Sequence, residues 1–265
     1  MRISLDWLRE WGDVEPDANK LACQLTTAGL EVEALFEAAP PFNGVIIGQI
    51  VSIEKHAKAD QLKVCGIDDG ESVRSVVCGA PNVEPGLKVA FAPVNSVLAS
   101  GACVEKTQLR GIWSEGMLCS AKELGLGEDD ESLLAFGFDA PTGASLKQHL
   151  KLEDTILDID LTPNRGDCFS VLGIAREASA IYGLSMKPNP VRTVAEVIAD
   201  QFPVSLKADA ACPSFFGRVI RNIKVDVSSP LWMKERLRRA GVRSIHPVVD
   251  VTNYVMLEFG QPLHA

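Results

Sequence analysis

Apolar residues recur at helical spacing in the first thirty positions and at strand spacing directly after them. Residues 4–11 and 17–29 each begin with a side chain that can cap a helix, Ser4 and Asp17, and each places its leucines on one side. Residues 30–35 then alternate apolar and acidic side chains, which is typical of a half-buried strand. The sequence therefore predicts two short helices followed by a strand.

A different pattern begins at residue 45. Short apolar runs rich in valine and isoleucine follow one another closely and are separated by turns that contain glycine or proline. Strands are expected at residues 45–51, 62–67, 74–78 and 88–92. Strands this short and this close together predict a small all-β barrel rather than a βαβ sheet.

Helix and strand patterns return after the barrel. Residues 156–161 alternate as a strand, and residues 162–166 form a turn. Asp167 can cap a helix that runs to Tyr182, with Gly183 as its stop. The sequence predicts one α/β unit that is split by the inserted barrel.

The last third of the chain begins with a proline-rich linker. Strands are expected at residues 202–206 and 215–225, and Ser229 is expected to cap a helix with Pro230 at its first position. The pattern continues up to Ala265, so we expect the chain to be the first part of a longer protein.

Charge and cysteine usage narrow the possible functions. The net charge of −9 disfavours one large basic surface for nucleic acid, so any RNA contact must be local or involve another subunit. None of the seven cysteines follows another at the spacing of a zinc knuckle, and their number is odd. This usage predicts reduced thiols in the cytoplasm and no metal site. No apolar run is long enough for a signal peptide or a membrane span.

Three stretches together resemble the tRNA-binding OB module. Free-standing tRNA-binding proteins, some methionyl-tRNA synthetases and bacterial phenylalanyl-tRNA synthetase β chains share this module. The stretches are HAKADQLKV at 56–64, VCGAPNV at 77–83 and LRGIWSEGMLCS at 109–120. Two positions depart from the family: Ala57 replaces the usual proline, and Gln61 replaces a lysine that could contact phosphate.

The flanks of the barrel resemble the β chain in particular. The matching stretches are DLTPNRGDC at 160–168, PLWMKERL at 230–237, DVTNYV at 250–255 and GQPLHA at 260–265. The resemblance implies an α+β, multidomain fold, with an OB-fold barrel in a small split α/β domain and then the start of an α+β editing domain. The expected parts are 1–39, 40–150 for the barrel, 151–190, a linker at 191–200, and 201–265 for the editing domain.

The resemblance also implies a function. The chain is expected to be part of the β subunit of phenylalanine–tRNA ligase and to contribute tRNA binding, structure and part of editing. The partners implied are the α subunit in an α2β2 heterotetramer and phenylalanine tRNA, with no DNA and no membrane. ATP and magnesium would be used by the complete enzyme and not bound by this fragment, which is expected to be inactive alone. The alternative is a free-standing tRNA-binding or structural OB module.

The resemblance implies candidate site residues as well. His56, Lys63, Ser114, Glu115 and Met117 match motif positions that border the RNA site in related modules. The alternative is that these residues only shape turns and close the barrel. Residues 40–150 contain nine basic and fourteen acidic side chains, which disfavours tight binding of RNA by the barrel alone.

One further histidine has an implied role in proofreading. A pocket for an aromatic amino acid cannot strongly reject an analogue that only adds a hydroxyl group, so tyrosine attached to this tRNA must be hydrolysed elsewhere. His264 matches a histidine that lines the editing pocket of the family and is the candidate there.

Overall fold

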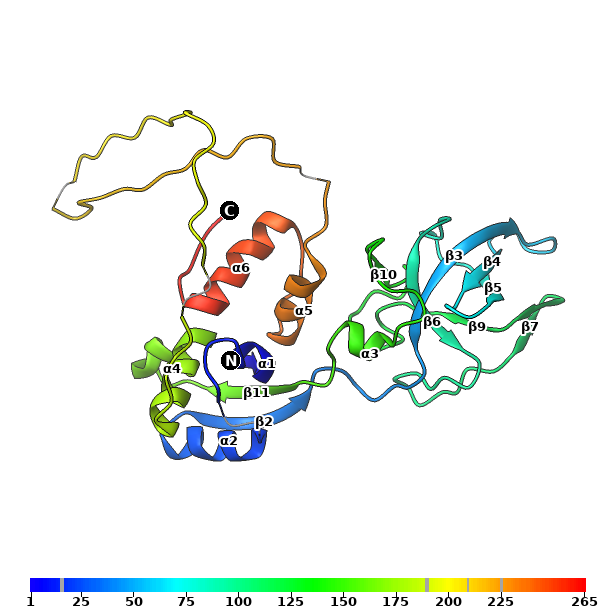
Figure 1. The fold of residues 1–265 in the computed structure, drawn as a ribbon, viewed down its shortest axis with the longest axis horizontal. Helices are drawn as coiled ribbons and strands as arrows, with labels where there is room; N and C mark the ends of the chain where they lie inside the picture. The colour runs from blue at the N-terminus through cyan, green and yellow to red at the C-terminus, as the bar shows by residue number, and fades with distance from the viewer. Residues whose placement is uncertain (15–16, 189–190, 209, 225) are drawn as a thin grey trace.

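Two bodies make up the chain, and two chain segments connect them (Figure 1). The computed structural model describes residues 1–14, 17–188, 191–208, 210–224 and 226–265. One body contains helices and a small sheet, and the other is a β-barrel. The predicted fold class, α+β with an inserted barrel, is therefore confirmed. None of the helices in the described residues is long and apolar enough to cross a lipid bilayer.

The sheet of the first body brings together residues from both sides of the barrel. Its antiparallel strands lie in the order β1-β11-β2, with bounds Arg2–Ser4, Thr155–Asp160 and Glu31–Glu37. The central strand β11 follows the barrel in sequence, while its two neighbours precede it. The split α/β unit expected from the sequence is thus present, since neither half has a complete sheet alone.

Helices cover this sheet and bury its apolar side chains. They are α1 (Leu5–Arg9), α2 (Ala18–Thr27) and α4 (Val171–Tyr182). Both predicted N-caps are confirmed: Ser4 accepts from the Trp7 N–H, and Asp17 accepts from the N–H groups of Asn19 and Lys20. The core includes Trp7, Trp11, Leu21, Leu25, Leu157 and Ile174.

The predicted cap of α4 is wrong. Pro163 begins a 3₁₀ turn, η1 (Pro163–Cys168), and this turn includes Asp167. The helix begins after Ser170, whose hydroxyl accepts from the Gly173 N–H at 2.9 Å. Gly183 ends α4 in the left-handed conformation, as the sequence predicted.

The second body is a nearly closed antiparallel barrel. Its main sheet has the order β10-β6-β3-β4-β5, and β9 pairs with β6. A two-stranded hairpin, β7-β8, extends from it, and β8 and β9 lie against β5. The strands are β3 (Ile46–Lys55), β4 (Lys63–Asp68), β5 (Val73–Cys78), β6 (Lys88–Pro93), β7 (Thr107–Leu109), β8 (Ile112–Ser114), β9 (Gly116–Leu118) and β10 (Ala135–Phe136). A short helix, α3 (Leu146–His149), precedes the return to the first body.

The strands expected at 202–206 and 215–225 are not present in the residues that the structure describes there; Val225 lies outside them. An extended segment becomes a strand only when a neighbour completes its hydrogen bonds, and none is described beside these residues. Two helices follow, α5 (Leu231–Arg239) and α6 (Pro247–Phe259). Ser229 does not cap α5, because its hydroxyl donates to Asp250 and Pro230 takes the N-cap position.

Helices α5 and α6 pack on the first body. Tyr254 of α6 stacks on Trp7 with ring centroids 5.2 Å apart, and Phe259 and Trp11 form a T-shaped pair with centroids 5.6 Å apart. Both tryptophan N–H groups donate to the buried carboxylate of Glu258. Residues far apart in sequence therefore form one packed unit around α1.

Candidate nucleic-acid interface

The loop after β3 and the turn between β7 and β8 meet through His56. This side chain is only 4% exposed, and its Nδ1 accepts from the Lys58 N–H at 3.1 Å. The other ring nitrogen, Nε2, therefore carries the proton and donates to the Leu109 carbonyl at 3.2 Å. Because both nitrogens are engaged, His56 holds two loops together and does not face solvent.

Four basic residues lie in these loops or at the strand ends beside them, and we call Lys55, Lys58, Lys63 and Arg110 the basic corner. Lys55 and Lys63 are directly paired across β3 and β4, so they lie on one face of the sheet. Arg110 donates to the Lys58 carbonyl at 3.3 Å and has a positive φ of 50°. Lys55, Lys58 and Arg110 are exposed, and Lys63 is half-buried.

The basic corner is a local exception in an acidic chain. The acidic side chains of Glu54 and Asp60 lie in the same stretch of sequence and are also exposed. Lys63 donates to the Val83 carbonyl at 3.3 Å, which leaves part of its hydrogen-bonding capacity for another acceptor. Exposed lysine and arginine side chains on neighbouring loops are suited to contact a phosphate backbone.

The motif at residues 114–117 closes the barrel. Ser114 is buried, accepts from the Val77 N–H at 3.1 Å and donates to the Gly116 carbonyl at 3.0 Å. The backbone N–H of Glu115 donates to the Ser75 carbonyl at 2.8 Å. These bonds join the β8–β9 connection to β5, so Ser114 has a clear structural task.

Glu115 is half-buried and engaged with a neighbouring lysine. Its carboxylate lies 2.7 Å from the Lys106 ammonium. The hydrogen bond and charge of Lys106 hold the pKa of Glu115 below its ordinary value. Glu115 is therefore an anion beside the barrel face, which does not favour direct phosphate contact.

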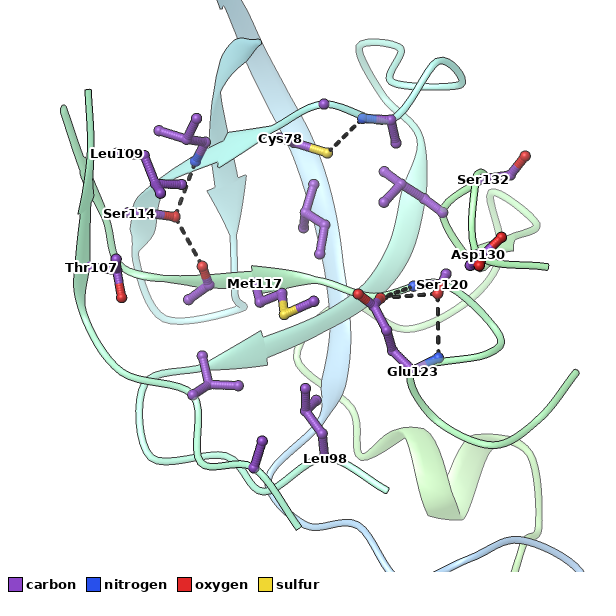
Figure 2. A pocket seen from close by; sticks show the side chains of 18 of the residues that line it. Cys78, Leu98, Thr107, Leu109, Ser114, Met117, Ser120, Glu123, Asp130 and Ser132 are labelled. Carbon is purple, nitrogen blue, oxygen red and sulfur yellow. Dashed lines mark hydrogen bonds between the residues drawn. The ribbon is translucent and has the colours of Figure 1, made fainter. Parts of the chain in front are cut away.

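A groove of about 850 Å³ runs along the barrel surface (Figure 2). Ser114 and Met117 line it, whereas His56, Lys63 and Glu115 do not. Its charged lining consists of acidic residues, with no lysine or arginine among the described residues: Glu105, Glu123, Asp130 and Glu131. The structure thus brings Ser114 and Met117 together at the groove and places His56, Lys63 and Glu115 outside its lining. The basic corner is better suited to RNA phosphates than the groove.

A possible metal-ligand cluster lies in the first body. The ligand atoms of Asp167, Cys168 and Glu177 lie within 4.8 Å of one another, the one such group in the described residues. The Arg165 guanidinium lies 3.2 Å from Asp167 and 2.6 Å from Glu177. Burial raises the pKa of the Cys168 thiol to about 11, so the thiolate is disfavoured. Because the guanidinium already balances the carboxylates, the cluster is better described as an ion-pair network.

His264 lies apart from the barrel candidates. Helix α6 ends at Gly260, which has a positive φ of 74°, and the last residues leave it as an exposed segment. Figure 1 shows this segment beside the first body, away from the barrel.

Comparisons with known proteins cover the barrel and its flanks. Residues 45–145 match the family described as "Putative tRNA binding domain", and residues 211–265 match the B3/4 domain. Over the whole chain, the identity is 52% to the phenylalanine–tRNA ligase beta subunit of Coxiella burnetii and 48% to that of Hahella chejuensis. The chain spans 34% of the length of each. A solved C-terminal domain of Plasmodium vivax p43 is 26% identical over 37% of this chain and 56% of that one, with a TM-score of 0.28.

Proposed function

Because the chain is a relative of the β subunits of phenylalanine–tRNA ligases along its whole length, we propose that it acts as part of such a subunit. Its role is to contact tRNA and to support the architecture around the editing region, while amino-acid activation takes place on the α subunit. The match extends through both flanks of the barrel, which favours this function over that of a free-standing OB module.

The proposed assembly follows from the same relationship. The working enzyme is an α2β2 heterotetramer in the cytoplasm that uses ATP and magnesium and attaches phenylalanine to its tRNA. Within it, residues 40–150 form the tRNA-binding-type barrel, and residues 201–265 begin the editing domain. His264 belongs to the editing pocket and orients the mischarged 3′ end or a water molecule at the ester.

One observation carries the proposed tRNA contact: the basic corner combines Lys55 and Lys63, at the adjoining ends of β3 and β4, with Lys58 and Arg110 on two neighbouring turns. The groove beside it is lined by acidic side chains and would repel phosphates. We therefore place the phosphate contacts at the corner. Met117 lines the adjacent groove, the buried Ser114 joins the β8–β9 connection to β5, and His56 keeps the two loops in register.

The test is the salt dependence of tRNA affinity. Four phosphate contacts give a slope of log affinity against log salt of about −3. We expect the double variant Lys58→Glu and Arg110→Glu to reduce affinity at least about tenfold at low salt, and to bring the slope nearer to about −1.5. Fluorescence anisotropy with phenylalanine tRNA measures both quantities.

A matched control separates the local contact from net charge. The double variant Lys20→Glu and Arg192→Glu changes the charge by the same amount at exposed positions outside the barrel. It should leave the slope unchanged. An equal loss of affinity in both double variants would show that the basic corner is not the contact.

A further inference from the structure

The connection between the two bodies consists of two chain segments. The outgoing segment passes through Ala38, and the returning segment passes through residues 150–154. They bond to each other once, from the Ala38 N–H to the Asp154 carbonyl at 2.9 Å. By itself, so narrow a connection would allow the barrel to change its direction relative to the first body.

Arg239 of α5 binds the returning segment. One guanidinium nitrogen lies 2.8 Å from the Asp154 carboxylate. The other donates to the carbonyls of Leu150 at 2.7 Å and Lys151 at 3.0 Å. The Arg239 side chain is 8% exposed and that of Asp154 is 0% exposed, so this ion pair is shielded from solvent.

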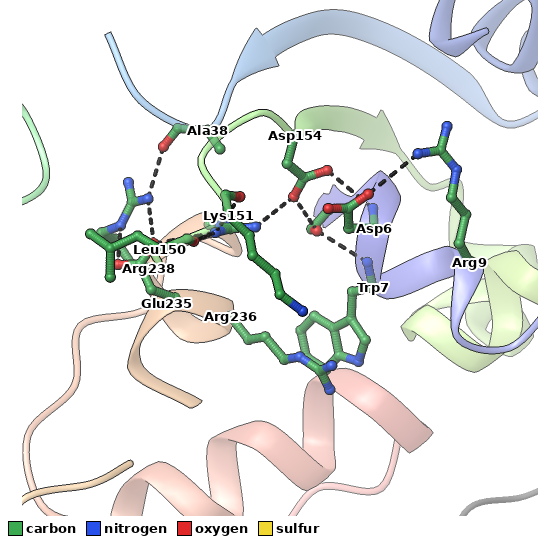
Figure 3. Close-up of polar contacts among 12 residues, drawn as sticks. Asp6, Trp7, Arg9, Ala38, Leu150, Lys151, Asp154, Glu235, Arg236 and Arg238 are labelled. Carbon is green, nitrogen blue, oxygen red and sulfur yellow. Dashed lines mark hydrogen bonds and ion pairs between the residues drawn. The ribbon is translucent and has the colours of Figure 1, made fainter. Parts of the chain in front are cut away.

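Arg238, the next residue, binds the outgoing segment. Its Nη2 donates to the Ala38 carbonyl at 2.8 Å. Glu235, one turn earlier in α5, accepts from Arg238 at 2.8 Å and from Arg239 at 3.4 Å, which holds both guanidinium groups in place. Figure 3 shows these contacts converging from α5 on the two segments.

The Asp154 carboxylate extends the network into the first body. It accepts from the Ser4 hydroxyl and from the Asp6 N–H at 3.0 Å, at the start of α1. Asp154 thus joins the returning segment, α1 and α5 at one buried point. Removal of Arg239 would leave this carboxylate without its cation.

We propose that Arg238 and Arg239 form a clamp that fixes the direction of the barrel relative to the first body. Planar guanidinium groups suit this task because each can reach two or three acceptors at once, which a lysine ammonium on a flexible stem does less well. The clamp goes beyond the proposed tRNA contact, since it makes the barrel's position depend on the docking of α5. A segment that matches the B3/4 domain therefore sets where the tRNA-binding-type barrel points.

Docking of α5 has its own contacts, so the clamp can be removed while α5 stays in place. The Arg236 guanidinium lies over the rings of Trp7 in α1 at 5.1 Å and Tyr254 in α6 at 5.8 Å. It also donates to the Tyr254 hydroxyl at 2.8 Å. These contacts involve neither connecting segment, and variants of Arg238 and Arg239 leave them intact.

The test measures the distance between the two bodies with spin labels on native cysteines. Cys23 on α2 and Cys103 on the barrel are exposed, and Cys212→Ser removes the remaining exposed thiol. The other four cysteines are buried, and burial raises the pKa of Cys65 to about 11 and that of Cys119 to about 12, which keeps these thiols unreactive at neutral pH. Pulsed electron–electron double resonance then gives the distribution of distances between the labels on Cys23 and Cys103.

We expect a single narrow distribution in the parent protein and at least a twofold broader one in the double variant Arg238→Gln and Arg239→Gln. The control Arg243→Gln removes an exposed arginine just beyond α5 and should keep the narrow distribution. Arg239→Lys retains the charge opposite Asp154 but loses carbonyl contacts, so it should give an intermediate width.

Two outcomes would overturn the clamp: an unchanged width in the double variant, or equal broadening in the Arg243→Gln control. If the double variant fails to fold, the single variants Arg238→Gln and Arg239→Lys replace it as the test. Both must then broaden the distance distribution. Circular dichroism shows whether a variant has lost secondary structure. If the two arginines only stabilised the fold, the broadening would come with such a loss. No tRNA is present, so the result is independent of the proposed RNA contact.

Discussion

Gly116 shows why the barrel motif contains a glycine. Its φ of 136° is a backbone conformation that other residues rarely adopt, and an added Cβ would lie 2.6 Å from Phe91 Cε2 and 2.7 Å from the Ala92 carbonyl. Both atoms belong to β6 in the barrel core. The motif position therefore lets β9 approach β6 closely, whether or not RNA binds beside it.

Replacing this glycine should destabilise the barrel. Gly116→Ala adds both backbone strain and overpacking, which together cost roughly 2–5 kcal/mol of unfolding free energy. Hydrogen exchange of the β6 and β9 amides measures the loss. Gly86→Ala is the matched control, because Gly86 has a φ of 84° but nothing within 4 Å of an added Cβ, so it should cost about 1 kcal/mol. Equal losses in the two variants would contradict the steric argument.

At the residue scale the sequence located the motifs but not the directions of their side chains. His56 and Ser114 match motif positions, yet both are buried and bonded within the barrel. The direction in which a side chain points depends on which strands pair with each other. Strand pairing is decided by contacts between residues that are distant in the sequence. The sequence did not single out Lys58 and Arg110, although both lie within the stretches that resemble the tRNA-binding module and both are exposed. Lys58 and Arg110 come close to each other because Arg110 lies at the turn of the β7–β8 hairpin. No local pattern in the sequence indicates where this turn packs.

At the element scale, predictions succeeded where the determining contacts are local. Caps formed by Ser4 and Asp17 act on backbone groups within three residues, so sequence spacing was enough. Prediction failed at Ser229, whose hydroxyl binds Asp250 on another helix. It also failed for residues 202–206, where alternation gives a strand only if a second strand lies beside it. Tertiary partners of this kind are absent from a local pattern.

Asp250 links the start of α6 to the segments before α5 and α6. Its carboxylate is buried and accepts from the Ser229 and Ser244 hydroxyls and from the Ile245 N–H at 2.9 Å. Burial alone would raise the pKa of this carboxyl group. The hydrogen bonds outweigh burial and hold the pKa below its ordinary value.

The lowered pKa predicts acid sensitivity of α6. The unfolded state takes up the proton more readily, so the stabilisation by Asp250 is complete above the unfolded pKa of about 4 and is lost as the pH falls below it. Hydrogen exchange of the α6 amides, measured between about pH 6 and pH 3, follows this loss. Asp250→Asn should be less stable at pH 6 and should show a weaker dependence over this range. The same pH dependence in both proteins would show that another group is responsible.

At the scale of the whole molecule, the proposed functions lie on different bodies. The basic corner is on the barrel, whereas His264 is on the segment that matches the B3/4 domain. With a net charge of −9 the chain lacks long-range attraction for RNA, so the proposed RNA contact has to be local. Through α5, the clamp relates the position of one body to the other. Sequence periodicity identified each body but not this relation, which depends on Arg238 and Arg239 meeting segments far away in the chain.

Proofreading tests the role proposed for the segment that carries His264. The chain spans about a third of its relatives, and His264 is exposed in the described residues. We therefore expect the 265-residue chain alone not to hydrolyse tyrosine attached to phenylalanine tRNA, and the complete αβ enzyme to do so. In the complete enzyme, His264→Ala should slow hydrolysis by about tenfold or more, since a positioned acid–base group contributes at least that much. The control His149→Ala removes a histidine that packs on Phe136 in the barrel, and it should leave hydrolysis unchanged. Unaltered proofreading by the His264→Ala enzyme would exclude His264 from the editing site.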